Sequence, residues 1–264
     1  MKKLPLLLLL LVATSLFAHE FWLMPNKFRL NLNETFNLQL FVGEDFMGDV
    51  WANRKKRLLK LTRHSNTSQK DLTALALKSD SLPMPLKFDT EGTHLLSMES
   101  KNSFIALEAT KFNDYLIEDG IEKIYELRKK KGELDKPSKE LYRRCAKTLI
   151  QVGDKFDETY KKNTQMALEI IPLKNPYQML VGDEMIVKVL FKNKPLTNKM
   201  ILAWHKTDTE KTTHQKLKTD ADGMLKMKLD KAGYWMFSTV HMVEIKNNPD
   251  ANYQSYWGNL TFLL

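Results

Sequence analysis

Cysteine is almost absent from this chain: Cys145 is the only one among 264 residues. A single thiol excludes an intramolecular disulfide, so a fold of this size must be held together by its hydrophobic core. Leu141, Cys145 and Leu149 are spaced four apart, which predicts one face of a helix. We therefore expect a buried thiol at Cys145 and not a nucleophile.

The short patterns that mark many catalytic and metal sites are also missing. The sequence contains no HExxH or CxxC pattern, no GxSxG pattern and no glycine-rich phosphate loop. We predict that the protein is not an enzyme. A metal site would have to be assembled from residues that are distant in the sequence.

The chain has no apolar run long enough to anchor it in a membrane. Leu4–Val12 follows two lysines and precedes small and polar residues, which is the order of a secretory signal peptide. A transmembrane helix would need about 20 apolar residues. We predict cleavage after Ala18; a cut after Ser15 is the alternative. Cleavage after Ala18 gives a periplasmic or secreted protein without a transmembrane anchor, and its first residue is His19.

Basic residues exceed acidic ones only moderately. Lysine and arginine number 41 against 32 aspartates and glutamates, a formal net charge of +9. Basic clusters occur at 54–57 and 128–131. Solvated surface charge is their ordinary explanation, and attraction to an anionic envelope or polymer is the alternative. Neither cluster lies beside an aromatic platform, so we do not expect a nucleic-acid partner.

Alternating apolar residues predict a mainly β protein. Apolar and polar residues alternate from Phe28 to Val42, as in half-buried strands. Beyond residue 166, turns at 193–196, 219–223 and 231–233 recur at the intervals of an Ig-like sandwich. The expected fold is two Ig-like or prealbumin-like β-sandwiches.

Between 111 and 152 the apolar spacing becomes helical. Residues 132–137 break it into two runs; Pro137 suits the first turn of a second helix, and Gly153 suits its end. We therefore expect an inserted helical hairpin. The predicted order is a signal peptide over 1–18, an N-terminal β-sandwich over 19–110, the hairpin over 111–165 and a C-terminal Ig-like sandwich over 166–264.

Six histidines are candidate metal ligands, because neutral imidazole binds copper, nickel and zinc. His19 ranks first, since an N-terminal histidine chelates a metal through both its amine and its ring. The apolar run Phe21–Met24 is expected to dock onto the sandwich and hold His19 in place. Glu20 is adjacent, but successive strand residues point to opposite faces, so it is not expected to share the ion.

His241 ranks second as a ligand. Alternation along a strand from Tyr234 places it in line with Trp235 and Phe237. The nearby carboxylates are expected to ligate or to orient its ring, and His205, after Trp204, is a weaker candidate that would point away from the core. The predicted metal-ligand set is thus His19, His241, Asp250, Glu244 and His205. The other histidines are expected at the surface: His64, His94 and His214.

Several segments resemble the DUF4198 family of exported bacterial proteins. They are AHEFWLMP at 18–25, KFNDYL at 111–116 with Asp119-Gly120, LEIIPLKNPY at 168–177, and VHM at 240–242 followed by SYWGNLTF at 255–262. The resemblance implies an Ig-like sandwich and a provisional link to nickel or cobalt uptake. The sequence segments at 192–196 and 219–223 are similar to those of prealbumin-like modules, which are generally scaffolds.

We therefore predict an exported protein that binds nickel, cobalt or copper through His19 and His241. It would capture the metal or deliver it to an uptake transporter or outer-membrane receptor. A carbohydrate- or protein-binding module is the alternative, using the aromatic residues Trp51, Tyr253, Tyr256 and Trp257. A copper enzyme with a histidine brace ranks third.

Overall fold

The structure, a computed structural model, describes residues 20–264. His19 and the predicted cleavage site at Ala18 lie outside the described residues.

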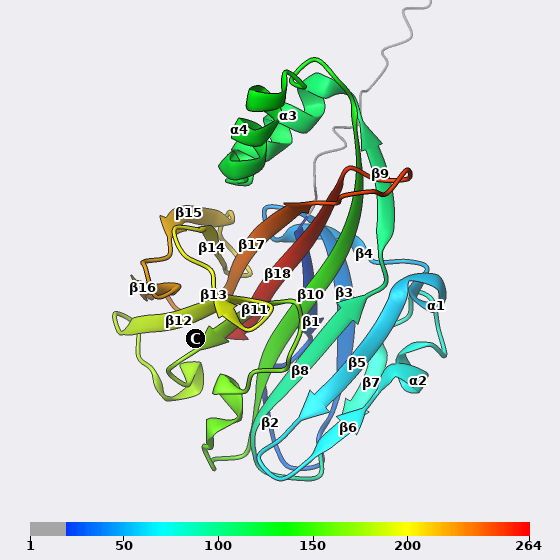
Figure 1. The fold of residues 1–264 in the computed structure, drawn as a ribbon. Helices are drawn as coiled ribbons and strands as arrows, with labels where there is room; N and C mark the ends of the chain where they lie inside the picture. Colours follow the sequence, from blue (N-terminus) through cyan, green and yellow to red (C-terminus); the bar gives the residue numbers. More distant parts are fainter. Residues whose placement is uncertain (1–19) are drawn as a thin grey trace, which may run out of the picture.

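A ten-stranded sheet forms the centre of the molecule (Figure 1). Its main path runs β15 (Thr213–Lys218), β14 (Met200–Lys206), β17 (Tyr234–Glu244), β18 (Tyr253–Leu263), β10 (Ser138–Val152), β8 (Gly92–Ser100), β5 (Leu58–His64) and β6 (Gln69–Asp71). Two short strands, β2 (Arg29–Leu30) and β9 (Ser103–Leu107), also pair with β10.

Two smaller sheets pack on opposite faces of the central one. The first contains β1 (Glu20–Pro25), β3 (Thr35–Glu44), β4 (Met47–Val50) and β7 (Met84–Lys87). Its core against β5, β8 and β10 includes Phe36, Leu61 and Ile150. The second contains β11 (Leu168–Pro172), β12 (Glu184–Phe191), β13 (Lys194–Pro195) and β16 (Met224–Lys228), with Val187, Ala203 and Phe237 in its core.

The two predicted sandwiches are therefore confirmed, but they share one continuous sheet. The join is a parallel pairing of β10 with β18, from Glu140 opposite Tyr253 to Thr148 opposite Thr261. The long crossover that parallel pairing requires is supplied by the second half of the chain.

A helical hairpin caps one end of the central sheet (Figure 1). It consists of α3 (Ala109–Glu118) and α4 (Glu122–Lys131), and it connects β9 to β10. Phe112, Tyr115 and Leu116 bury its inner face against Val240 and Trp257 of the sheet. The remaining helices are short: α1 (Arg54–Arg57), α2 (Thr73–Ala76), and the 3-10 turns η1 (Glu158–Lys161) and η2 (Pro176–Gln178).

The predicted second helix at 137–152 is wrong, because these residues form strand β10. Residues four apart share a face in a strand as well as in a helix, so Leu141, Cys145 and Leu149 fit both. The strand is buried on both faces, which removes the alternation that would have identified it. The buried thiol is confirmed, and burial raises the pKa of Cys145 to about 12.

Within residues 20–264, no helix is long and apolar enough to cross a membrane.

Candidate functional site

Strand β1, which begins at Glu20, pairs with β3 in the first small sheet and is hydrogen-bonded to the central sheet. The side chains of Phe21, Trp22 and Leu23 are at most 2% exposed, which confirms the predicted docking of this segment. The Asn259 side-chain amide donates a hydrogen bond to the Phe21 carbonyl, and Thr261 Oγ1 donates to the Leu23 carbonyl at 2.9 Å. The chain immediately after His19 is thus held by the central sheet.

The Glu20 carboxylate is oriented by a short chain of hydrogen bonds. Trp204 Nε1 donates to Ser238 Oγ at 2.9 Å, and Ser238 Oγ donates to Glu20 Oε1 at 2.8 Å. An indole nitrogen can only donate, so the Ser238 oxygen accepts from Trp204, and its own hydrogen is donated to Glu20 when that carboxyl group is ionised. The position of Glu20 is therefore set by β14 and β17.

A pocket of about 410 Å³ opens beside Glu20, within the size range of small-ligand sites. Five carboxylate side chains and one lysine line it. The carboxylates come from β1, the β3–β4 turn and the end of α3. The lining residues are Glu20, Glu44, Asp45, Glu118, Asp119, Leu202, Trp204, His214 and Lys216.

Two of these carboxyl groups hold their protons unusually strongly. Burial raises the pKa of Glu20 to about 7, against the opposing effects of the Ser238 hydrogen bond and Arg144. Burial, and then the negative charge of Glu20, raises the pKa of Asp119 well above its ordinary value, although Lys199 opposes this. No residue in 20–264 donates a hydrogen bond to the Asp119 carboxylate.

The position of Asp119 adds to the negative potential. It directly follows α3, at the negative end of the helix dipole. Gly120, in a left-handed conformation with φ of 61°, makes the turn into α4. Its carbonyl accepts a hydrogen bond from Lys199 Nζ at 2.7 Å, which ties the turn to the sheet. The pocket thus favours a cation over an anion.

His241 lies apart from this pocket. Its ring packs on Phe191, with ring centroids 4.2 Å apart, on the face that Trp235 and Phe237 also occupy. The predicted alternation along β17 is confirmed. Burial, followed by the charges of Lys199, Lys123 and Lys192, lowers the pKa of His241 to about 4. The ring is neutral at pH 7, but the surrounding ammonium groups oppose the binding of a metal cation.

The other predicted ligands are dispersed. His205 is 3% exposed, and its Nε2 lies 2.9 Å from the Ala232 carbonyl. Its expected outward orientation is wrong, because the central sheet is covered on both faces there. Glu244 pairs with Lys131, and Asp250 is exposed in the β17–β18 turn.

The register of the sheet keeps these residues apart. His205 is opposite Trp235, near the start of β17, whereas His241 and Glu244 lie toward its end. Among residues 20–264, no three His, Cys, Asp or Glu side chains are grouped closely enough to hold a metal ion. A metal in the pocket beside Glu20 would therefore need a donor from outside the described residues, and His19 is bonded directly to Glu20.

The aromatic residues of the alternative hypothesis are mostly inaccessible. Trp51, Tyr253 and Trp257 are 1%, 2% and 8% exposed, and Tyr256 is partly buried against Phe191. Buried rings cannot form a binding platform, so these residues do not support a carbohydrate or protein contact.

Sequence reasoning missed Asp119, and it also misplaced two histidines. His64 and His94 are 7% and 0% exposed, contrary to the surface positions expected, whereas His214 is exposed as predicted. The Asp-Gly pair at 119–120 was a detectable signal, because glycine commonly ends a helix. Its proximity to Glu20 depends on tertiary structure.

Comparison with known protein families identifies the family of this chain. A family model described as "Domain of unknown function (DUF4198)" matches residues 16–243. The chain belongs to the DUF4198 family. No curated protein shows a significant match to it.

Two solved structures show weak similarity to this DUF4198 chain. The D0-D1 domain of Intimin is 13% identical, with a TM-score of 0.22 and coverage of 92% of this chain and 97% of that chain. A Salmonella alpha-2-macroglobulin mutant is 10% identical, with a TM-score of 0.22 and coverage of 92% of this chain and 15% of that one. Neither similarity carries an argument about function.

Proposed function

We propose that this protein is exported and captures a transition-metal ion in the pocket beside Glu20, for delivery to an uptake system. The observation that carries the proposal is the pair Glu20 and Asp119. These two carboxyl groups with raised pKa values line a pocket that begins one residue from the predicted mature N-terminus.

The donor set determines the kind of metal. Cleavage after Ala18 would give His19 a free amine beside its imidazole, and both nitrogens would chelate one ion. Nitrogen ligands suit nickel, cobalt and copper, whereas carboxylates alone would suit calcium or magnesium. Glu20 and Asp119 would lose their protons as the cation binds, and their charges would balance it.

This site replaces His241 in the predicted ligand set. A cation at His241 would face Lys199, Lys123 and Lys192, while a cation beside Glu20 would face mainly carboxylates. His214 also lines the pocket, and its ring packs on Trp204 with centroids 4.5 Å apart. The copper-enzyme alternative stays a prediction; it would require an imidazole such as that of His214 on the same ion.

Membership of the DUF4198 family supports nickel or cobalt as the cargo, through the family's provisional link to uptake of these metals. The partner would then be an uptake transporter or an outer-membrane receptor. Both would require the periplasmic or secreted location that the signal peptide predicts.

The test is a calorimetric titration of Ni²⁺ into exported protein whose intact mass shows His19 as the first residue. We expect saturable binding that weakens by at least about tenfold in His19→Ala, and equally when one alanine is added ahead of His19. The added alanine removes the amine from the histidine but keeps every side chain. Unchanged affinity in both variants would exclude the N-terminal site.

A further inference from the structure

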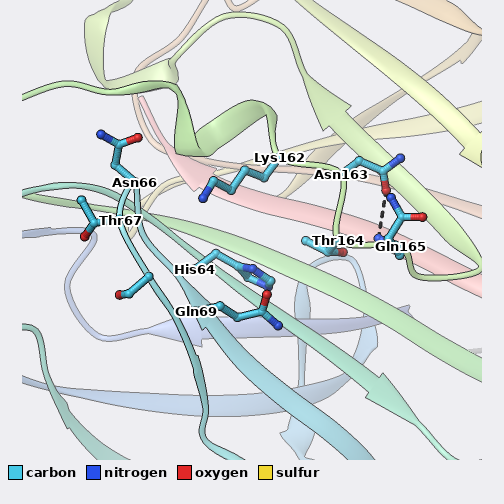
Figure 2. Close-up of a pocket in the computed structure, with 9 residues that line it drawn as sticks. His64, Asn66, Thr67, Gln69, Lys162, Asn163, Thr164 and Gln165 are labelled. Atoms are coloured by element: carbon cyan, nitrogen blue, oxygen red, sulfur yellow. Dashed lines mark hydrogen bonds between the residues drawn. The ribbon is translucent and has the colours of Figure 1, made fainter.

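A second pocket lies where the two sandwiches meet, away from Glu20. The turn between β5 and β6 forms one wall, and the segment at 162–165, which leads into β11, forms the other (Figure 2). Its volume is about 370 Å³. The lining residues are His64, Asn66, Thr67, Ser68, Gln69, Lys162, Asn163, Thr164 and Gln165.

The side chains that line this pocket are all polar. The lining contains four side-chain amides, three hydroxyls, one imidazole and one ammonium group, and it contains no carboxylate and no Phe, Tyr or Trp side chain. Side chains that are all polar offer a hydrophobic ligand little apolar surface, and the absence of Phe, Tyr and Trp removes the stacking surface that a neutral sugar would use. Hydrogen-bond donors and one positive charge remain.

Lys162 supplies that charge. Its Nζ donates to the Ser65 carbonyl at 2.7 Å, which uses one of its three hydrogens. The nearby Lys147 is neutralised by Glu169, at 2.8 Å in a buried ion pair. Lys162 is therefore the cation whose charge faces the pocket.

Side-chain hydrogen bonds stiffen the wall at 162–165. Asn163 Oδ1 accepts from the Gln165 backbone at 2.9 Å, as the dashed line in Figure 2 shows. Asn193 accepts from the Asn163 amide at 2.9 Å and donates to Gln165 Oε1 at 2.6 Å. These bonds hold Gln165 in a left-handed conformation, with φ of 66°. Such backbone strain in a non-glycine residue is common at binding sites.

The opposite wall is anchored by His64. Its Nε2 lies 2.8 Å from Ser97 Oγ, inside the central sheet. Burial and the nearby Lys162 and Lys147 lower the pKa of His64 to about 4, while Glu169 opposes this. The imidazole is therefore neutral at pH 7, and the local potential is positive.

We infer that this pocket binds a small tetrahedral oxyanion, a phosphate or sulfate group, with Lys162 as its charged partner and the side chains of Asn66, Thr67 and Gln69 as further donors. An ammonium with free hydrogens beside amide and hydroxyl donors matches the several acceptor oxygens of such a group. The group is either a free ion or carried on a sugar. This inference is independent of the metal site.

The test is titration of the full mature protein at low ionic strength with inorganic phosphate, sulfate and glucose 6-phosphate, followed by amide NMR shifts. We expect saturable shifts confined to residues 64–69 and 162–165. Lys162→Gln should weaken binding by about tenfold or more, because it removes a charged hydrogen bond. Lys155→Gln is the matched control, since that side chain is 80% exposed and lies outside the pocket.

The outcomes separate the sources of the anion. Tighter binding of glucose 6-phosphate indicates a sugar-borne group, and equal or tighter binding of the inorganic ions indicates a free anion. The inference is overturned if none of the three ligands saturates by about 10 mM, a very weak affinity. Equal weakening in Lys162→Gln and Lys155→Gln would also overturn it, because only general charge attraction would then be acting.

Discussion

Ser238 Oγ donates a hydrogen bond of 2.8 Å to the carboxylate of Glu20, and so joins the start of the described chain to the middle of the central sheet. Ser238 also accepts from Trp204, which fixes the position of its hydroxyl oxygen. The residue next to the predicted mature N-terminus is thereby held in one orientation. A metal site that uses this end would be formed on a rigid support.

Between pH 8 and pH 6 the affinity for nickel should change more steeply with pH than the amine and imidazole of His19 alone would give. Burial raises the pKa of Glu20 to about 7, so a proton competes with the metal as the pH falls through 7. We expect Ni²⁺ affinity to fall steadily between pH 8 and pH 6. Calorimetry in buffers of different ionisation enthalpy would count the protons released. An affinity that is constant above pH 6 and falls only below it would contradict a role for Glu20.

Gly120→Ala should weaken both the fold and the metal site. A Cβ at this position would lie 2.6 Å from Met200 Cβ, so the turn that carries Asp119 must shift. Gly132→Ala is the matched control, because Gly132 has a similar φ of 64° and nothing within 4 Å of the added carbon. Both variants should lose about 1 kcal/mol from the left-handed conformation.

Only Gly120→Ala should lose more stability than this and also lose nickel affinity, as measured by chemical denaturation and titration. Equal stabilities and equal affinities of the two alanine variants would show that the turn does not position Asp119.

Glu140 should make stability fall with rising pH. It accepts hydrogen bonds from Tyr115 of α3 and from Ser255 of β18, so it links the helical hairpin to the sheet. Burial raises its pKa from 4.5 to about 7. The folded state therefore binds more protons than the unfolded state between these values, and the stabilisation present below pH 4.5 is lost as the pH rises through 7.

The size of this effect can be measured against Glu140→Gln, which does not titrate. The stability of the wild type relative to the variant should decrease by about 3 kcal/mol between pH 4 and pH 8. Urea denaturation at several pH values provides the comparison. A difference that does not change with pH would mean that Glu140 titrates normally in the fold.

The buried ion pair between Lys147 and Glu169 should be costly to break. Both side chains are at most 1% exposed, and the pair joins the central sheet to β11. Glu169→Gln leaves the Lys147 ammonium buried without a counter-charge, and should cost about 3–5 kcal/mol. Replacing both residues by apolar ones should recover much of this loss.

An exposed pair serves as the control for that prediction. Lys155 and Glu91 form an ion pair of 2.9 Å at the surface, and breaking it should change the free energy of unfolding by at most about 1 kcal/mol. Similar losses from the two pairs in thermal or urea unfolding would contradict the predicted effect of burial.

Much of the fold could be predicted from local pattern. The alternation from Phe28 to Val42 predicted strands, and β2 and β3 lie there. Strand β10 could not be recognised, since it is buried on both faces and carries polar residues such as Lys147 and Gln151 at buried positions. A segment of that kind has neither the period of a half-buried strand nor a uniformly apolar composition.

The candidate site was predictable only in part. The predicted cleavage of the signal peptide made residue 19 a candidate ligand, and the apolar residues that follow residue 19 predicted the docking of β1. The carboxylate of Asp119 could not be placed beside Glu20, because the chain crosses both the first sandwich and α3 between them. The lysines around His241 could not be foreseen either, since Lys123 comes from α4 and Lys192 and Lys199 come from the segments next to β12 and β14.

On the function proposed here, the metal binds beside Glu20 and Asp119 and not at His241. The most direct measurement compares Ni²⁺ affinity in Asp119→Asn, His241→Phe and Asp114→Asn, all with His19 as the first residue; Asp114 is an exposed carboxylate on α3 that controls for the loss of charge. We expect a loss of about tenfold or more for Asp119→Asn, and unchanged affinity for the other two variants. Loss of binding in His241→Phe with full affinity in Asp119→Asn would contradict it.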